Sequence, residues 1–328
     1  MTKEKSRILK KANDDKTRPV SFNDSFGGSE NQLRLLLKNL EEEDFRDINL
    51  ILNNANYDLV EKNKINVLWM QHFVNQKEAQ NLGSKDFVEK LDYIIFNSNW
   101  NFEKFQYQFK IPEEKSLVIK NAIEKINFKE KPKNKINLIY HTTPWRGLTH
   151  LLKVFKNLNL ENVELNVCSS TIIYGKKFDE NLGKKYENIF NECKSIKNIN
   201  YLGFVDNSKI LELLKEMHIF AHPSIWPETS CVSAIEAMAA GCEVVGSNLG
   251  ALYETCSPFG TLISFDRNFE NFEKKYQKIL LNSVKNFWSE ENQKKLKLQR
   301  ETINLIYSWD ARSIEWKNFF EEARKVKK

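Results

Sequence analysis

Residues 218–255 carry the pattern that most restricts the fold of this chain. A short apolar run, Ile219–Ala221, is followed by a proline-containing loop, by helix-forming residues at about 230–240, and by the apolar run Val244–Gly246. Gly241 follows the expected helix directly, at the position where helices commonly end on a residue with positive φ. The pattern predicts strand, loop, helix and strand, the unit from which parallel α/β sheets are built.

Two carboxylates stand within this stretch. Glu228 lies just before the expected helix, and Glu236 lies inside it among alanine, valine, isoleucine and methionine. Burial of an unpaired carboxylate costs several kcal/mol, so a buried Glu236 requires a partner. Two plainer interpretations stay open: Glu228 can be a favourable charge in the first turn of a helix, and Glu236 can face solvent.

The start of the expected helix is suited to an anion. Thr229 and Ser230 can cap the helix, and its free backbone N–H groups, together with the positive end of the macrodipole, form a cradle for a phosphate. A phosphate beside two carboxylates suggests a nucleotide with hydroxylated attachments. The candidate ligand-binding residues here are Thr229, Ser230, Cys231, Val232 and Glu236.

A longer ordered pattern surrounds the two carboxylates. It consists of Pro223-Ser224, Pro227-Glu228-Thr229, Ala234-Ile235-Glu236-Ala237-Met238-Ala239-Ala240-Gly241 and Gly250-Ala251-Leu252-Tyr253-Glu254-Thr255. This pattern resembles the donor-site block of retaining glycosyltransferases of family 4, within the glycosyl transferases group 1. The resemblance implies the α/β fold named GT-B: two Rossmann-like domains whose parallel sheets face a central cleft, with a C-terminal helix that crosses back to the first domain.

The length of 328 residues allows two domains of ordinary size. A polar, lysine-rich segment at 129–135 separates two series of short apolar runs, which alternate with helical segments as buried parallel strands do. Ser308–Phe320 resembles the closing helix of the family. The expected parts are a basic N-terminal extension at 1–18, an acceptor domain at 19–128, a nucleotide-sugar donor domain at 129–305 and the crossing helix at 306–328.

The composition indicates a soluble, cytoplasmic chain. No run of eighteen apolar residues occurs, and the first residues lack the apolar centre of a signal peptide. The five cysteines are scattered, odd in number and without a Cys-x-x-Cys pair, so we expect neither disulfides nor a zinc cluster. The net charge of +6 permits an anionic partner without requiring one. Seven Lys or Arg in residues 1–18 could touch an anionic membrane surface, but a solvated extension is favoured.

Two sites in the N-terminal half fit a ligand cleft. After an expected short strand at Val20–Phe22, two glycines at Gly27-Gly28 would let the backbone approach a ligand. His72 follows the apolar run Val67–Gln71, at the carboxyl end where ligands of open α/β sheets gather. A structural role for a lone His is as well founded. By resemblance, Gly28 lies near the diphosphate and His72 contacts the transferred sugar.

The C-terminal half offers a cation. The expected strand Ile136–Tyr140 leads to a loop in which Arg146 precedes Gly147, and the planar fork of an arginine suits the paired oxygens of a diphosphate. A surface Arg that caps the loop is the alternative. Relatives usually carry two cations here, whereas this chain has His141, Thr142 and Thr143 at the first place. We expect Thr142 or His141 to share the neutralisation.

The resemblance also assigns roles. It implies that Gly203-Phe204-Val205 reads the base through its backbone, that Glu236 holds the ribose hydroxyls, and that Glu228 holds hydroxyls of the donor sugar. The expected reaction moves a sugar from a nucleoside diphosphate sugar to a glycan, lipid or other hydroxyl acceptor with retention of configuration. Glu228, Arg146 and His72 are the expected catalytic residues. No metal and no other cofactor is expected, because Asp-x-Asp is absent from the sequence, and a monomer is expected.

Other classes of protein fit less well. A nicotinamide-dependent dehydrogenase would need Gly-x-Gly-x-x-Gly after a strand, which the sequence lacks. A nucleic-acid binder would need a basic stripe with interleaved aromatic residues, whereas basic and acidic residues are mixed here. A sugar-nucleotide epimerase or a binding-only relative of the same fold remains the alternative.

Overall fold

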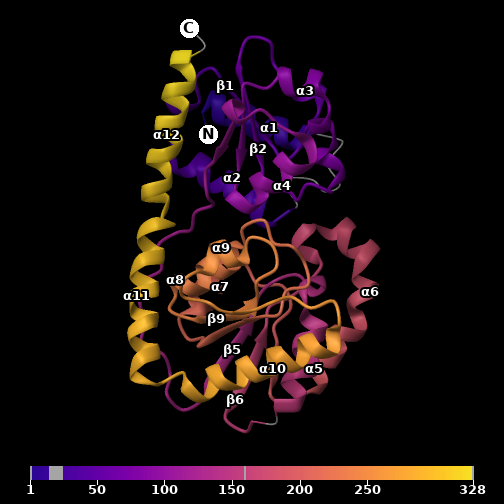
Figure 1. Ribbon diagram of the computed structural model, residues 1–328, viewed down its shortest axis with the longest axis vertical. Coiled ribbons are helices and arrows are strands. Elements are labelled where there is room, and N and C mark those ends of the chain that lie inside the picture. The colour runs from indigo at the N-terminus through magenta and orange to yellow at the C-terminus, as the bar shows by residue number, and fades with distance from the viewer. Residues whose placement is uncertain (1, 15–24, 159, 327–328) are drawn as a thin grey trace. The chain divides into compact units, whose positions relative to one another are not determined.

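The computed structural model describes residues 2–14, 25–158 and 160–326, and it divides into two compact units (Figure 1). Unit 1 comprises Met1–Ala122 and Tyr307–Lys328, and unit 2 comprises Ile123–Ile306. The division therefore falls after residues 122 and 306, while the sequence placed its boundaries after residues 128 and 305. None of the described helices is both long and apolar enough to cross a membrane.

Unit 1 contains a four-stranded parallel sheet in the order β1-β2-β3-β4. Its strands are β1 Ile48–Leu52, β2 Ile65–Met70, β3 Tyr93–Phe96 and β4 Ser116–Val118. Every residue of β1 and β2 is buried, as expected of parallel strands covered on both faces. The expected strand at Val20–Phe22 lies outside the described residues.

Helices cover both faces of this sheet. Alternate residues of the strands separate into two cores: Leu50, Val67 and Trp69 belong to one, whereas Leu68 and Phe96 belong to the other. The first core also takes residues of the helices α1, α2 and α12, and the second takes residues of α3, α4 and the 3-10 helix η3. The bounds of these helices are α1 Lys3–Asp14, α2 Gly28–Asn39, η3 Lys77–Gly83, α3 Lys85–Glu89, α4 Asn99–Phe109 and α12 Trp309–Val326.

Helix α12, the last of the chain, is part of the first core. The ring of Trp316 lies edge-on to Trp69 of β2, with 4.9 Å between the ring centroids, and the side chain of Trp316 is fully buried. Phe320 packs with Phe45 at 5.7 Å. Both contacts hold the C-terminal end of the chain in unit 1, so this unit is assembled from both ends of the sequence.

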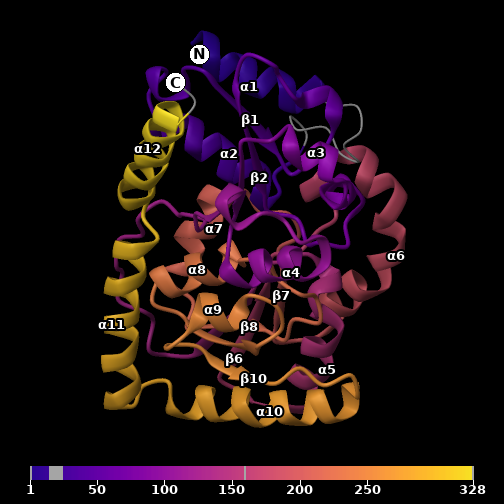
Figure 2. The ribbon, with the colours of Figure 1, turned by 45° about the horizontal axis from the view of Figure 1, so that its top comes forward.

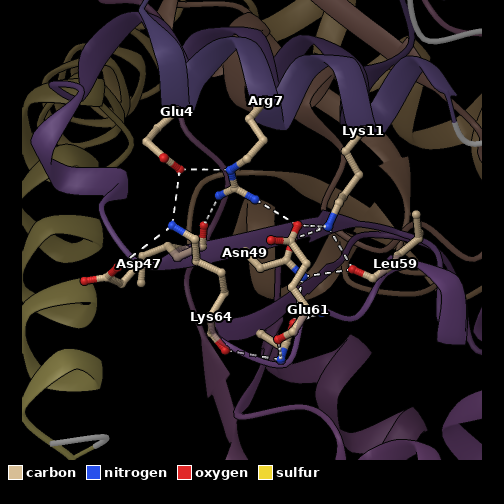
Figure 3. Close-up of polar contacts among 10 residues, drawn as sticks. Glu4, Arg7, Lys11, Asp47, Asn49, Leu59, Glu61 and Lys64 are labelled. Atoms are coloured by element: carbon tan, nitrogen blue, oxygen red, sulfur yellow. Dashed lines mark hydrogen bonds and ion pairs between the residues drawn. The ribbon is translucent and has the colours of Figure 1, made fainter.

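The expectation of a solvated N-terminal extension is wrong for residues 3–14. Ile8 of α1 is only 2% exposed and belongs to the first core. On the polar side of α1, Arg7 contacts Glu61 at 2.9 Å, and Lys11 donates to Asn49 at 2.6 Å and also pairs with Glu61 (Figure 3). The basic residues that suggested a free tail therefore fasten the helix to β1 and to the β1–β2 connection.

Unit 2 contains a six-stranded parallel sheet in the order β10-β9-β8-β5-β6-β7. Helices α5 and α10 pack together against one core, while α7, α8 and α11 form another group (Figure 2). The strands are β5 Ile136–Tyr140, β6 Val163–Val167, β7 Ile199–Tyr201, β8 Ile219–His222, β9 Glu243–Ser247 and β10 Thr261–Ile263. The helices are α5 Leu148–Leu158, α6 Lys176–Ser195, α7 Asn207–Leu214, α8 Val232–Ala239, α9 Leu252–Cys256, α10 Phe269–Asn286 and α11 Glu290–Ile306.

The strand order of unit 2 has a switch point between β5 and β8. From β5 the chain builds the sheet outward through β6 to β7, and it then returns to the other side of β5 to place β8, β9 and β10. The loops that follow β5 and β8 therefore leave the sheet in opposite directions. In open α/β sheets, the crevice at the carboxyl ends beside such a point is where ligands bind.

Candidate functional site

The loops after β5 and β8 are brought together by a glycine. Gly147 has φ of 120°, and a Cβ added there would lie 2.1 Å from the carbonyl oxygen of Pro223, which follows β8. Only glycine allows this close approach of one backbone to another. Because Arg146 directly precedes Gly147, the contact places Arg146 against the loop that carries Glu228.

Arg146 and Glu228 form a buried ion pair across the switch point. The guanidinium donates to Glu228 Oε2, and the side chains are 24% and 3% exposed, respectively. Burial opposes ionisation of Glu228, but the charge of Arg146 and a hydrogen bond from His222 outweigh it and hold the pKa of Glu228 below its ordinary value. The same pairing outweighs the burial of Arg146 and raises its pKa. Both groups are charged at neutral pH.

The backbone around Glu228 is fixed by a second glycine. Gly250 forms a parallel bridge with Glu228, and the N–H of Ala251 donates to the Glu228 carbonyl at 2.6 Å. A Cβ added to Gly250 would lie 2.4 Å from both the nitrogen and the carbonyl oxygen of Glu228, and Gly250 has φ of 73°. The Gly250–Thr255 segment of the sequence pattern therefore serves to position Glu228.

Helix α8 begins later than expected and is not capped by a side chain. It starts at Val232, and its N-cap is Cys231, which adopts a left-handed conformation with φ of 66°. Thr229 and Ser230 lie in the preceding loop, so the expectation that they cap the helix is wrong. The Ser230 carbonyl instead accepts a hydrogen bond of 2.5 Å from the hydroxyl of Thr255. A non-glycine residue at positive φ is strained, and such strain gathers at functional sites.

Glu236 is buried within α8, only 5% exposed. Asn207, the first residue of α7, donates a hydrogen bond of 2.9 Å to its Oε1. Burial raises the pKa of Glu236 to about 7, because the hydrogen bond from Asn207 only partly offsets the loss of solvation. Among the described residues, no cation contributes to this shift, so a ligand that donates hydrogen bonds would find an acceptor that is poorly satisfied.

Helix α8 is anchored at its C-terminal end. Lys131, 7% exposed, donates to the Ala240 carbonyl at 3.1 Å and to the Leu214 carbonyl at the end of α7 at 3.2 Å. Gln299 of α11 donates to the carbonyl of Met238 at 3.1 Å. Cations at helix C-termini complement the macrodipole. These contacts hold α7 and α8, and hence Asn207 and Glu236, in fixed register.

Several buried polar atoms near the switch point lack a hydrogen-bond partner among the described residues. They are His141 Nε2 and Thr143 Oγ1 after β5, Arg146 Nε, Ser169 Oγ after β6 and His222 Nδ1 at the end of β8. Buried polar groups normally have a hydrogen-bond partner. Several buried groups without one therefore indicate a site where a polar ligand would supply the missing partners.

Neutral groups stand at the first of the two cation places, the one that this chain leaves without an Arg or Lys. Burial lowers the pKa of His141 to about 3, so this side chain carries no charge at neutral pH. Thr142 lies beside it and is half-buried. The loop after β5 therefore offers neutral hydrogen-bonding groups, and Arg146 is its positive charge.

One group of metal-type ligands occurs among the described residues. Ligand atoms of His222, Glu228 and Cys231 lie within 4.8 Å of one another, and all three residues are buried. Glu228 is already paired with Arg146, and a metal ion at this place would be repelled by the guanidinium.

The remaining expected residues lie as follows. Val205 is in the loop between β7 and α7, two residues before Asn207. In unit 1, Gly28 is the first residue of α2, and a Cβ built on it meets nothing within 4 Å, which leaves the backbone open to approach. His72 follows β2, with its Nδ1 3.8 Å from Glu78 Oε2. Gly28 and His72 belong to unit 1, and the other expected site residues belong to unit 2.

Sequence reasoning missed two residues that contact the carboxylates. His222 Nε2 lies 3.3 Å from Glu228 Oε1, and Asn207 binds Glu236. The position of His222 at the end of an apolar run, five residues before Pro227, was a usable signal. Asn207 gave none, because an asparagine at the start of a helix is common on any surface.

Comparison with known proteins places these features in context. A family model, Glycosyl transferases group 1, matches residues 119–298, more than half of the chain. A 41.2 kDa protein of the cps region of Klebsiella pneumoniae is 25% identical over 260 residues, covering 72% of this chain and 66% of the relative. The match thus spans just under two thirds of that relative's length.

Solved structures show the same fold. A glycosyltransferase from Rickettsia africae superposes with a TM-score of 0.65 at 16% identity, covering 95% of this chain and 84% of that one. Anabaena HepE in complex with UDP and glucose superposes with a TM-score of 0.66 at 15% identity, covering 92% and 84%. The α/β architecture with two parallel sheets is therefore that of GT-B glycosyltransferases, as the sequence predicted.

Proposed function

Because the chain belongs to the glycosyl transferases group 1 family, we propose that it is a transferase that moves a sugar from a nucleoside diphosphate sugar to a hydroxyl acceptor. We propose further that it acts with retention of configuration, as a member of family 4, without a metal ion or another cofactor. The structure of HepE was solved in complex with UDP and glucose, which makes UDP-glucose the first donor to test.

The observation that carries this proposal is the state of Glu236. Its carboxylate is buried in an apolar helix, its pKa is raised to about 7, and its hydrogen bond from Asn207 leaves the group short of donors. The two hydroxyls of a ribose are donors of the kind that a buried carboxylate requires. We assign Glu236 to the ribose on this ground.

Arg146 and Glu228 supply the remaining roles. As the bond between sugar and diphosphate breaks, negative charge grows on the diphosphate, and a preorganised guanidinium and the backbone N–H groups at Cys231, Val232 and the start of α8 would stabilise it. Glu228 would accept hydrogen bonds from donor-sugar hydroxyls. The hydroxyl of Thr142 and the backbone near Val205 would contact the diphosphate and the base.

Unit 1 is proposed to receive the acceptor, a glycan or a lipid-linked saccharide. The open backbone at Gly28 would approach the diphosphate, and His72 would contact the transferred sugar. Closure around the donor would exclude water, which protects the donor from hydrolysis. We also propose a cytoplasmic monomer, with any membrane contact peripheral.

The test is acceptor-dependent release of nucleoside diphosphate. Purified protein is incubated with a panel of nucleotide sugars, with and without a mixture of saccharide and lipid-linked acceptors, and with EDTA in a parallel series. We expect release that requires an acceptor and survives EDTA, and a product whose anomeric NMR signals match the configuration of the donor. Inversion, or loss of activity in EDTA, would contradict the corresponding part of the proposal.

A binding-only relative is the alternative that one observation favours. Arg146 and Glu228 are paired with each other, and the first of the two cations usual in relatives is absent. Tight nucleotide-sugar binding without release of diphosphate under any acceptor would establish this alternative. Conversion of the bound sugar to its epimer, without an acceptor, would instead indicate an epimerase.

A further inference from the structure

Glu228 is held by two donors, one on each carboxylate oxygen. Arg146 donates to Oε2, and His222 Nε2 lies 3.3 Å from Oε1. His222 has no exposed surface, and Glu228 is 2% exposed. Since the carboxylate is ionised and accepts only, this hydrogen bond requires a hydrogen on His222 Nε2.

The proposed function gives both residues of the pair a ligand: phosphate oxygens for Arg146 and sugar hydroxyls for Glu228. One guanidinium nitrogen, Nη1, contacts Glu228, while Arg146 Nε has no partner among the described residues and offers a first contact to phosphate. Donor binding in this way exchanges partners: the guanidinium moves to phosphate oxygens, and Glu228 turns to the sugar. During this exchange Glu228 loses its cation while it stays buried, which is strongly unfavourable unless another donor remains.

His222 is held in a position in which it stays in contact with Glu228 during this exchange. It is the last residue of β8, and its ring is stacked on Phe220 with 5.1 Å between centroids and an angle of 15°. Behind it, β9 runs so close that a Cβ added to Gly246 would lie 2.8 Å from the His222 carbonyl oxygen. The ring is therefore fixed by its strand and by packing. The guanidinium of Arg146, in contrast, is at the end of a long, flexible side chain that follows β5.

We propose that His222 is a positioning residue that keeps the Glu228 carboxylate in place, through the Nε2–H to Oε1 hydrogen bond, when the sugar nucleotide takes Arg146. The inference rests on the proposed function and extends it. The consequence is specific to the sugar. His222 should contribute to the affinity for a sugar nucleotide, whose sugar reaches Glu228, and not to the affinity for a nucleoside diphosphate, which lacks the sugar.

The test compares two ligands on three proteins. Affinities for UDP and for UDP-glucose, or for the nucleotide pair that the wild type selects from the panel, are measured by calorimetry for wild type, His222→Gln and His222→Asn. The amide nitrogen of Gln reaches the place of Nε2, and that of Asn reaches only the place of Nδ1. We expect His222→Asn to weaken the sugar nucleotide at least about tenfold and the diphosphate less than about twofold, and His222→Gln to restore most of the loss.

A double-mutant cycle separates this role from a merely structural one. In a Glu228→Gln background, His222→Asn should change the affinity for the sugar nucleotide less than about twofold, because its partner is already altered. An equal loss for both ligands, or a full effect of His222→Asn without the Glu228 carboxylate, overturns the inference while the proposed function stands. A wild-type protein that binds no nucleotide sugar overturns the proposed function itself.

Discussion

Asn207 donates a hydrogen bond of 2.9 Å to the buried carboxylate of Glu236, which joins the start of α7 to the middle of α8. Burial raises the pKa of Glu236 to about 7, and the hydrogen bond from the neutral amide offsets this only in part. Ionisation of Glu236 is therefore unfavourable unless a ligand donates further hydrogen bonds to the carboxylate.

Replacement of Glu236 by Gln should change how stability depends on pH. The folded pKa of about 7 lies above the ordinary value of 4.5, so the folded state keeps a proton that the unfolded state loses, and wild-type stability falls as pH rises from about 4.5 to 7. Relative to wild type, Glu236→Gln should gain on the order of 3 kcal/mol across this window. Urea unfolding at several pH values measures this, with Glu301→Gln, on an exposed part of α11, as the control. A constant difference between Glu236→Gln and wild type would argue against the raised pKa.

Breaking the Arg146–Glu228 pair should affect both activity and stability. Glu228→Ala and Arg146→Ala are each expected to lower the transfer rate at least about tenfold, equal to roughly 1.4 kcal/mol of transition-state stabilisation. Arg146→Ala leaves the buried Glu228 carboxylate without its cation, which costs about 3–5 kcal/mol of stability. Glu228→Ala leaves an Arg146 side chain that is 24% exposed and should cost less, and the double variant should lose less than the sum. Steady-state kinetics and urea unfolding check this, with Lys153→Ala as an exposed control. Wild-type rates in both single variants would refute the site assignment.

The variants Gly250→Ala and Gly241→Ala distinguish the effect of backbone strain at positive φ from the effect of a steric clash of the added Cβ. The two glycines have φ of 73° and 77°, but the added Cβ meets the backbone of Glu228 at 2.4 Å only at Gly250, while at Gly241 the nearest atom is 3.8 Å away. Both variants should lose the roughly 1 kcal/mol that a left-handed Ala costs. Only Gly250→Ala should also displace Glu228 and lower the rate, by about tenfold or more. Equal rates in the two variants would show that Glu228 does not depend on this contact.

The N-terminal helix should contribute to the stability of unit 1. Ile8→Ala removes a side chain that is 2% exposed, and Ile to Ala changes in cores cost about 2–5 kcal/mol. Lys10→Ala, on the exposed side of α1, should change stability by less than about 0.5 kcal/mol. Thermal unfolding followed by tryptophan fluorescence measures both. If Ile8→Ala proved as stable as Lys10→Ala, α1 would not be a packed part of the unit in solution.

Much of the fold could be predicted from local patterns. Short, mainly apolar runs such as Ile48–Leu52 and Ile136–Tyr140 are strands of the expected parallel sheets, because most residues of a strand buried on both faces are apolar. The start of α8 could not be predicted as well. Thr229 and Ser230 are good capping residues, but the left-handed Cys231 ends the loop and begins the helix after them, which is a tertiary constraint with no local signature.

The N-terminal helix shows how charge can mislead. Lysines and arginines around Ile8 suggested a solvated tail, yet Arg7 and Lys11 both pair with Glu61. Glu61 lies more than fifty residues after Arg7 in the sequence. Partners of that kind are invisible without the fold. For the same reason Asn207 could not be assigned to Glu236, although the carboxylate itself was identified.

The most direct test of the central claim is calorimetric titration of UDP, and of the other nucleoside diphosphates, near pH 7 in two buffers of different ionisation enthalpy. Ribose hydroxyls that donate to Glu236 favour its ionised form, so binding to the wild type should release more protons than binding to Glu236→Gln, and the variant should bind at least about tenfold more weakly. Comparing the two proteins cancels protons that the ligand itself releases. Equal affinity and equal proton release in wild type and Glu236→Gln would contradict the account.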